Sequence, residues 1–99
     1  MVKKNRTSWT FLTNHSHVLL CLVESPSIKM REIAEKVGIT ERAVQNIVSD
    51  LRKEDYIDRE KNGRRNTYQI NTEMHLKHPI EEHRTLADLI QLIYNNEES

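Results

Sequence analysis

The apolar positions of residues 30–51 follow a helical spacing twice in succession. In each half they fall at i, i+3, i+4 and i+7, which gives one apolar face to each of two short helices. The first set is Met30, Ile33, Ala34 and Val37, and the second set is Val44, Ile47, Val48 and Leu51. Gly38 can take the positive φ that ends a helix, and the Thr40 hydroxyl can cap the next one. The pattern therefore predicts two helices that cross sharply at a turn of about three residues.

This pair of helices has the spacing of a helix-turn-helix. Ala34 is small enough to let the helices approach, and Gly38 lies four positions later. Val44 and Ile47 are then expected to pack the second helix against the first. The pattern resembles DNA-binding helix-turn-helix regulators at every apolar and glycine position. A generic αα-hairpin is the alternative, but it does not by itself demand this spacing.

The opposite face of the second helix carries polar side chains. At 100° per residue, the buried positions leave a different set pointing outward. The residues that we expect to read base edges are Arg42, Gln45, Asn46 and Ser49. Arginine can form two hydrogen bonds to the edge of guanine, and glutamine and asparagine can form two to adenine. A solvated charged face is the alternative interpretation.

Two runs of strand-forming residues, 56–60 and 65–70, follow the second helix. Asn62-Gly63 lies between them and is a strong hairpin signal, because a type I′ turn needs positive φ at both central positions. The expected pairs are Ile57 with Tyr68 and Arg59 with Asn66. The sequence thus predicts a projecting two-stranded loop.

The predicted hairpin is rich in basic residues near its tip, as in the wing of a winged helix. Such cations can contact phosphate or enter the minor groove. The residues that we expect at the DNA backbone or minor groove are Thr40, Lys53, Arg59, Lys61, Arg64 and Arg65. Charge at the edge of a hairpin can also merely oppose aggregation, but the helix-turn-helix beside it favours DNA binding.

A C-terminal helix is predicted from Pro79 to about Asn95. Proline suits the first turn of a helix, and the acidic residues that follow favour its N-terminal dipole. Its apolar residues cover well over half of the circumference, so one stripe can pack on the body and the rest needs another surface. The residues expected at a two-fold dimer interface are Leu86, Leu89, Ile90 and Ile93. Packing wholly within the monomer is the alternative.

Size and composition indicate one domain over residues 1–99, with 36% hydrophobic and 30% charged residues. We divide it into a basic N-terminal arm (1–12), a winged helix-turn-helix (13–72) and a linker with the dimerisation helix (73–99). Trp9 and Phe11 lie in the arm, where we expect core packing, with a staple into a partner subunit as the alternative. The 15 basic and 15 acidic residues cancel, but the basic ones gather in the arm and the wing. The fold class is therefore mainly α with a small β-hairpin (α+β).

Other function classes receive less support from the sequence. Cys21 is the only cysteine, so no intramolecular disulfide can form, which favours a cytoplasmic location. The longest apolar run is far too short to span a membrane. No nucleophile elbow or phosphate loop is present, so we expect neither an enzyme nor a cofactor. His75, His78 and His83 are the candidates for a metal-responsive regulator, but Pro79 separates His83 from the other two.

The whole pattern resembles a winged helix-turn-helix transcriptional regulator, closest to the multiple-antibiotic-resistance regulator (MarR) type and more distantly to the arsenical-resistance (ArsR) type. The resemblance is carried by residues 30–44 and by the stretch from Leu51 through Tyr56-Ile57 to residues 62–65, and it covers roughly residues 13–72. It implies that the second motif helix enters the major groove and that the wing touches the flanking backbone. It also implies binding of a pseudo-palindrome as a dimer.

The chain departs from both types. The MarR type builds its dimer from N-terminal and C-terminal helices and holds an aromatic ligand between them, whereas one terminal helix must suffice here. The cysteine-containing metal box of the ArsR sensors is missing from the recognition helix. We therefore expect a homodimeric, sequence-specific prokaryotic regulator, a repressor by occlusion, that binds double-stranded DNA and no membrane. The sequence identifies no small-molecule effector, and a winged-helix protein-interaction module is the remaining alternative.

Overall fold

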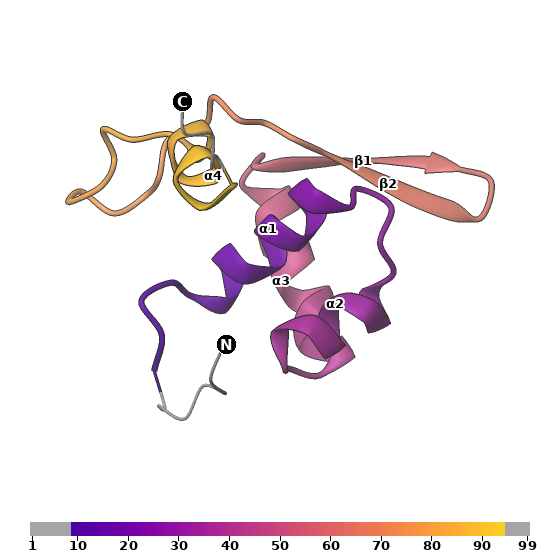
Figure 1. Ribbon diagram of the computed structural model, residues 1–99. Helices are drawn as coiled ribbons and strands as arrows, with labels where there is room; N and C mark the ends of the chain where they lie inside the picture. The colour runs from indigo at the N-terminus through magenta and orange to yellow at the C-terminus, as the bar shows by residue number, and fades with distance from the viewer. Residues whose placement is uncertain (1–8, 95–99) are drawn as a thin grey trace.

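The computed structural model describes residues 9–94, which contain four helices and one two-stranded antiparallel sheet. The elements are α1 (Asn14–Glu24), α2 (Met30–Val37), α3 (Glu41–Lys53), β1 (Ile57–Asn62), β2 (Arg65–Ile70) and α4 (Leu86–Tyr94). In Figure 1 the hairpin projects to the right of the helices, and α4 lies on the left near the start of β1. The predicted fold class is confirmed. Most of the predicted basic arm, residues 1–8, lies outside the described residues.

Side-chain caps start two of the three helices before the sheet. Thr13 accepts a hydrogen bond from the N–H of Ser16 at the start of α1, and Thr40 accepts one from Ala43 at the start of α3. Each threonine satisfies a backbone donor that has no partner within the helix. Gly38 ends α2 in the left-handed region, with φ at 86°. The predicted helix-turn-helix is thus confirmed at both its glycine and its cap.

The core lies where α1, α2 and α3 meet. It is built from the apolar faces predicted for α2 and α3, with α1 packed across them. Val18, Leu22, Ile33 and Val44 are fully buried. Tyr56 and Ile57 close the core at the start of the hairpin, and their burial fixes the wing to the end of α3.

The predicted hairpin register is wrong by two residues. The observed pairs include Ile57 with Ile70 and Arg59 with Tyr68, and each strand still keeps its two faces because side chains alternate with a period of two. The predicted turn is also wrong, since its central residues are Gly63 and Arg64. Of these only Gly63 has positive φ, at 64°, as in a type II′ turn. This pairing places Ile57 opposite Ile70 at the base of the hairpin, where both pack on the core.

The predicted start of the C-terminal helix at Pro79 is wrong as well, because α4 begins only at Leu86. Thr85 and Asp88 cap it reciprocally. The Thr85 N–H donates to Asp88 Oδ2 at 3.0 Å, and the Asp88 N–H donates to Thr85 Oγ1 at 3.3 Å. This capping box satisfies two donors, whereas Pro79 offers only a compatible φ. The predicted end at Asn95 lies outside the described residues.

The segment between β2 and α4 is an irregular loop that is tied back to the body. The Leu76 N–H donates to the carbonyl of Arg84 at 2.9 Å, which closes the base of the loop. The Tyr56 hydroxyl donates to the carbonyl of His75 at 2.8 Å, and Lys77 Nζ lies 2.8 Å from Glu54 Oε1. These contacts connect the C-terminal part to the end of α3.

Core packing of the two N-terminal aromatics is contradicted. Trp9 is 62% exposed and Phe11 is 92% exposed. Their rings meet edge to face with centroids 5.1 Å apart, so the two aromatic side chains pack on each other. This apolar pair therefore lies at the surface of a single chain.

Candidate nucleic-acid interface

Helix α3 separates its apolar and polar residues cleanly. Val44, Ile47, Val48 and Leu51 are buried against α1 and α2. The four predicted base-reading residues, Arg42, Gln45, Asn46 and Ser49, are all exposed. Their side chains therefore share the solvent side of a helix whose other side is held by the core, which is the arrangement needed to read base edges.

The predicted backbone contacts are exposed too, but they do not form one cluster. Arg59, Lys61, Arg64 and Arg65 lie on the hairpin, at or near its tip. Thr40 lies at the start of α3, where its oxygen is used as the helix cap. Lys53 lies in the last turn of α3 and lines a cavity next to α1 and the C-terminal part. The structure thus places the predicted contacts at three points around α3.

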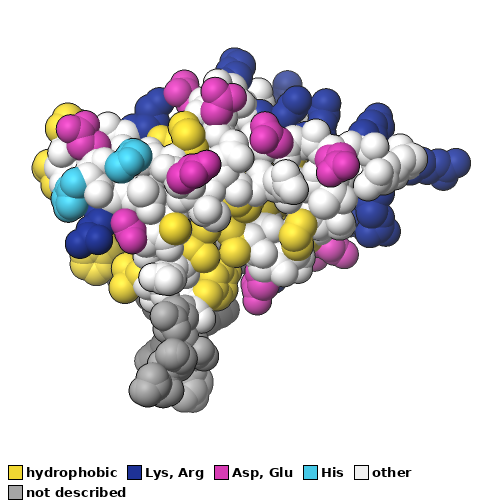
Figure 2. Space-filling view, turned by 90° about the horizontal axis from the view of Figure 1, so that it is seen from above, with side chains coloured by type: hydrophobic (Ala, Val, Ile, Leu, Met, Phe, Trp, Pro, Cys, Tyr) yellow, Lys and Arg dark blue, Asp and Glu magenta, His cyan; other side chains and the backbone are white. Residues whose placement is uncertain are grey.

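The positive charge of this surface is not neutralised internally. Among residues 9–94, no ion pair includes Arg42, Lys53 or any of the wing cations. Figure 2 shows Lys and Arg side chains along the upper edge of the molecule and at the projecting tip on the right, while hydrophobic side chains gather in the centre and on the left. The basic edge and the apolar surface are therefore separate.

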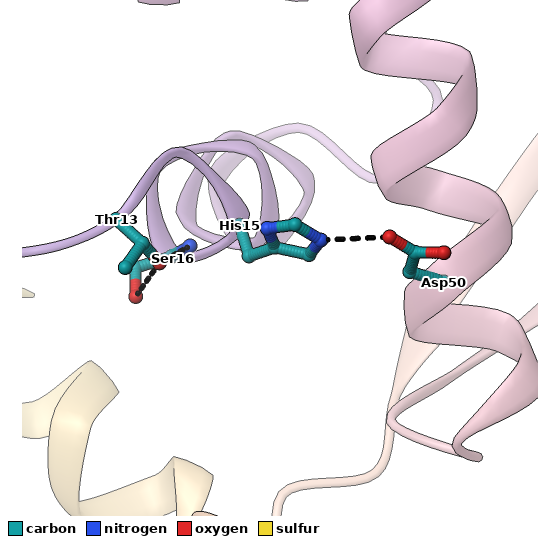
Figure 3. Close-up of polar contacts among 4 residues, drawn as sticks. All are labelled: Thr13, His15, Ser16 and Asp50. Carbon is teal, nitrogen blue, oxygen red and sulfur yellow. Dashed lines mark hydrogen bonds and ion pairs between the residues drawn. The ribbon is translucent and has the colours of Figure 1, made fainter.

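A contact between α1 and α3 was missed by the sequence reasoning. His15 Nε2 lies 2.9 Å from Asp50 Oδ2, with both side chains about half exposed (Figure 3). Asp50 directly follows Ser49, which is predicted to read bases, and its pair with His15 directs a carboxylate of α3 toward α1. The two residues are far apart in the sequence and belong to no local motif, so no signal could have found the pair.

The three candidate metal ligands are not brought together. His75 Nδ1 donates to the carbonyl of Glu82 at 2.8 Å, and His78 Nδ1 accepts a bond from the N–H of Ile80 at 3.1 Å. In the part of the chain that the structure describes, no group of three or more His, Cys, Asp or Glu residues could hold a metal ion. At least two of these histidines thus serve the loop backbone.

The predicted dimer residues of α4 differ in their exposure. Leu86 is only 4% exposed and belongs to the core of the single chain, so little of its side chain is left for a second copy to bury, and its dimer role stays a prediction. Leu89 and Ile90 are partly buried, whereas Ile93 is 44% exposed. Next to Ile93, Leu92 and Tyr94 are also exposed. The free apolar surface of the helix therefore lies toward its C-terminal end.

Cys21 is a partly buried residue of α1. Burial raises the pKa of its thiol, and the side chain packs against the core, as expected of a small core residue. None of the helices within residues 9–94 is long and apolar enough to cross a membrane.

Comparison with known protein families gives a match for the central part of the chain. Residues 12–58 match the family model described as winged helix-turn-helix DNA-binding. No match was found among curated protein sequences. This region is the one that contains α1, α2, α3 and the start of the wing.

Solved structures with a similar fold include the PcaV transcriptional regulator from Streptomyces coelicolor. In complex with its natural ligand, that protein aligns with a TM-score of 0.51 and 21% identity, over 100% of this chain and 68% of that one. A second PcaV structure aligns with a TM-score of 0.48 and 27% identity, over 58% of this chain. In that alignment this chain spans only 44% of the length of PcaV. The first alignment supports the winged-helix fold of the described residues.

Proposed function

We propose that this chain, whose residues 12–58 match a winged helix-turn-helix DNA-binding family model, is a MarR-like transcriptional regulator and acts as a homodimeric repressor that blocks its site by occupying it. One observation carries the proposal. The four side chains suited to base edges share the exposed face of α3, and the unpaired cations of the wing flank that face.

The proposal divides the DNA contacts into two roles. Arg42, Gln45, Asn46 and Ser49 read bases in the major groove. Thr40, Lys53 and the wing cations Arg59, Lys61, Arg64 and Arg65 hold phosphate or the minor groove. Since base contacts specify and phosphate contacts position, the two groups should respond differently to a change of DNA sequence.

The dimer contact is assigned to the exposed apolar end of α4. Leu92, Ile93 and Tyr94 are exposed there in a single chain, and Leu89 and Ile90 extend the surface toward the core. Trp9 and Phe11 add a second exposed apolar patch. A second copy would bury such surfaces and place two recognition helices about one turn of DNA apart. We further propose that the protein acts in the cytoplasm of a prokaryote, by binding rather than by catalysis.

Selection from a random duplex pool, followed by salt-titrated binding to the enriched site, tests this function. We expect a palindromic motif with half-sites about one helical turn apart and a steep salt slope. Arg42→Ala should relax specificity at one or two base pairs. Lys61→Ala should weaken binding to all sequences and reduce the salt slope by about one.

The opposite results have equally definite meanings. Identical losses by both variants across a site library would contradict the division of roles. No enrichment from the pool would favour the alternative of a protein-interaction module. A chelator that changes binding or melting would revive the metal-responsive alternative with His75, His78 and His83.

A further inference from the structure

Asn62 and Gly63 form the only asparagine–glycine pair of the chain, and they lie at the tip of the hairpin. The turn itself does not require the asparagine. Gly63 and Arg64 are the central residues of the turn, and Asn62 ends β1 without a positive φ. The Asn62 side chain is exposed. What distinguishes Asn62 is therefore the residue that follows it.

An asparagine that precedes glycine can react with its own backbone. The glycine nitrogen gives its proton to hydroxide and attacks the side-chain amide carbon, Cγ, of the asparagine. The new C–N bond closes a succinimide ring, and the side-chain nitrogen takes up a proton and leaves as ammonia. Water then opens the ring at either carbonyl, which gives aspartate or isoaspartate. No electrons are gained or lost, and solvent water is the only co-reactant.

The surroundings of Gly63 leave room for this reaction. Glycine has no Cβ to shield its nitrogen, and a Cβ added at Gly63 would meet no atom within 4 Å. Within residues 9–94 the Gly63 N–H donates no hydrogen bond to a backbone carbonyl, so solvent can remove its proton. The nitrogen of Gly63 is thus accessible to base, and the ring has open space in which to form.

The basic residues around the turn add an electrostatic effect. Lys61, Arg64 and Arg65 are exposed, and no ion pair in the described part of the chain includes them. A positive charge close to a group favours the anionic form of that group, which here is the deprotonated nitrogen of Gly63. These cations therefore promote the attack on Cγ of Asn62.

The two asparagines that follow in the chain lack these conditions. Asn66 and Asn71 each precede a threonine, whose branched side chain hinders access to the backbone nitrogen. Asn66 is only partly exposed, and Asn71 Nδ2 donates to the carbonyl of Asp55 at 2.6 Å. Both residues therefore serve as internal controls for Asn62.

We propose that Asn62 is a self-modification site, at which the protein converts its own asparagine to aspartate or isoaspartate as it ages. The product places a carboxylate between Lys61 and Arg64, and isoaspartate also adds a methylene group to the backbone of the turn. The consequence for DNA rests on the proposed function, because the new charge matters only where the wing lies against phosphates. There the carboxylate opposes the wing cations, so the DNA affinity declines irreversibly with the age of the protein.

The first test is incubation of the unaltered chain at a series of pH values, followed by proteolysis and mass spectrometry of the hairpin peptides. We expect the Asn62 amide to be lost with first-order kinetics, at a rate that rises in proportion to the hydroxide concentration, while Asn66 and Asn71 persist. Asn62→Gln is the matched control, because its longer side chain has to close a larger ring and should persist as well. If Asn62 lasted as long as Asn66 and Asn71, the modification would be refuted.

Salt-titrated DNA binding measures the consequence of the modification. Asn62→Asp reproduces the new charge, and it should lower the slope of log K against log salt by about 0.9 and the affinity about 5-fold at about 0.15 M salt. Asn62→Gln should bind like the unaltered protein, and melting curves show whether both variants keep the fold. Equal DNA binding by the two variants would overturn the inferred loss of affinity.

The two inferences fail separately. Specific DNA binding by a protein whose Asn62 does not convert would overturn only the modification. Conversion of Asn62 in a protein that binds no specific DNA site would overturn only the proposed function, and with it the effect of the modification on DNA binding.

Discussion

Thr40 has two roles in the account above, and a pair of nearly identical substitutions can separate them. Its hydroxyl oxygen accepts the Ala43 N–H at 3.0 Å and so caps α3, and it is also assigned to the DNA backbone. Asparagine and aspartate both cap helices at least as well as threonine. Thr40→Asn and Thr40→Asp should therefore fold equally well, while only the aspartate places a negative charge beside the phosphates.

The sizes of the two effects follow from simple estimates. Loss of the cap in Thr40→Ala should destabilise the protein by about 1 kcal/mol, a fall in Tm of about 4 to 8 °C for a domain of this size. For Thr40→Asp, a carboxylate about 5 Å from a phosphate in water costs about 0.8 kcal/mol. The lost donor to phosphate adds about 1 kcal/mol. Together these terms predict DNA binding about 20-fold weaker than that of Thr40→Asn at low salt.

Thermal melting and salt-titrated binding of the three variants decide the matter. We expect the Asn and Asp variants to melt near the unaltered protein and to differ in DNA affinity, with the difference shrinking as salt is added. Equal DNA affinity of the two at low salt would refute a phosphate near Thr40. A large fall in Tm for Thr40→Asn would refute the assignment of the cap.

Further expectations concern the turn, the C-terminal helix and the dimer. Gly38→Ala should lower the free energy of unfolding by about 1 to 2 kcal/mol through backbone strain alone, because φ is 86° and no atom lies within 4 Å of an added Cβ. A much larger loss of stability in denaturant unfolding would indicate a steric clash. The backbone hydrogen bond from Thr85, together with the charge of Arg84, lowers the pKa of the Asp88 carboxyl. The stability that the ionised carboxylate contributes to the folded protein is therefore present above the ordinary carboxyl pKa and is lost as the pH falls through the lowered pKa. Asp88→Asn should therefore flatten the acid side of the stability profile, and an unchanged profile would contradict the cap. Ile93→Asp should shift the protein from dimer to monomer in sedimentation with little change of fold. Leu86 is buried, so Leu86→Ala should lower the free energy of unfolding by about 2 to 5 kcal/mol. A dimer that survives Ile93→Asp would place the interface elsewhere.

The helix-turn-helix could be predicted because its signals are local. The apolar spacing, the left-handed glycine and the threonine cap all act within a few residues of one another, and all three lie where they were predicted. The exposure of the four residues predicted to read bases followed directly from that spacing, since one face of an amphipathic helix determines the other.

The errors arose where two local signals competed. Asn62-Gly63 and Gly63-Arg64 both suit a tight turn, and the choice depends on the packing of Ile57 and Ile70 at the base of the hairpin. At the C-terminus, the sequence predicts a helix start at Pro79, but the capping box begins at Thr85. The contact between His15 and Asp50 could not be predicted at all, because it depends on how α1 packs against α3.

The bond from Tyr68 to Pro26 has a consequence for the behaviour of the protein at high concentration. Exposed strand edges are templates for other chains, and proteins usually protect them. Here the outer edge of β2 is occupied by a carbonyl of proline, a residue that has no N–H with which to extend a ladder. Beyond that point β2 leads into the arginine-bearing tip of the hairpin, and two such tips repel each other. Two copies of the protein are therefore hindered from pairing through this edge of the wing.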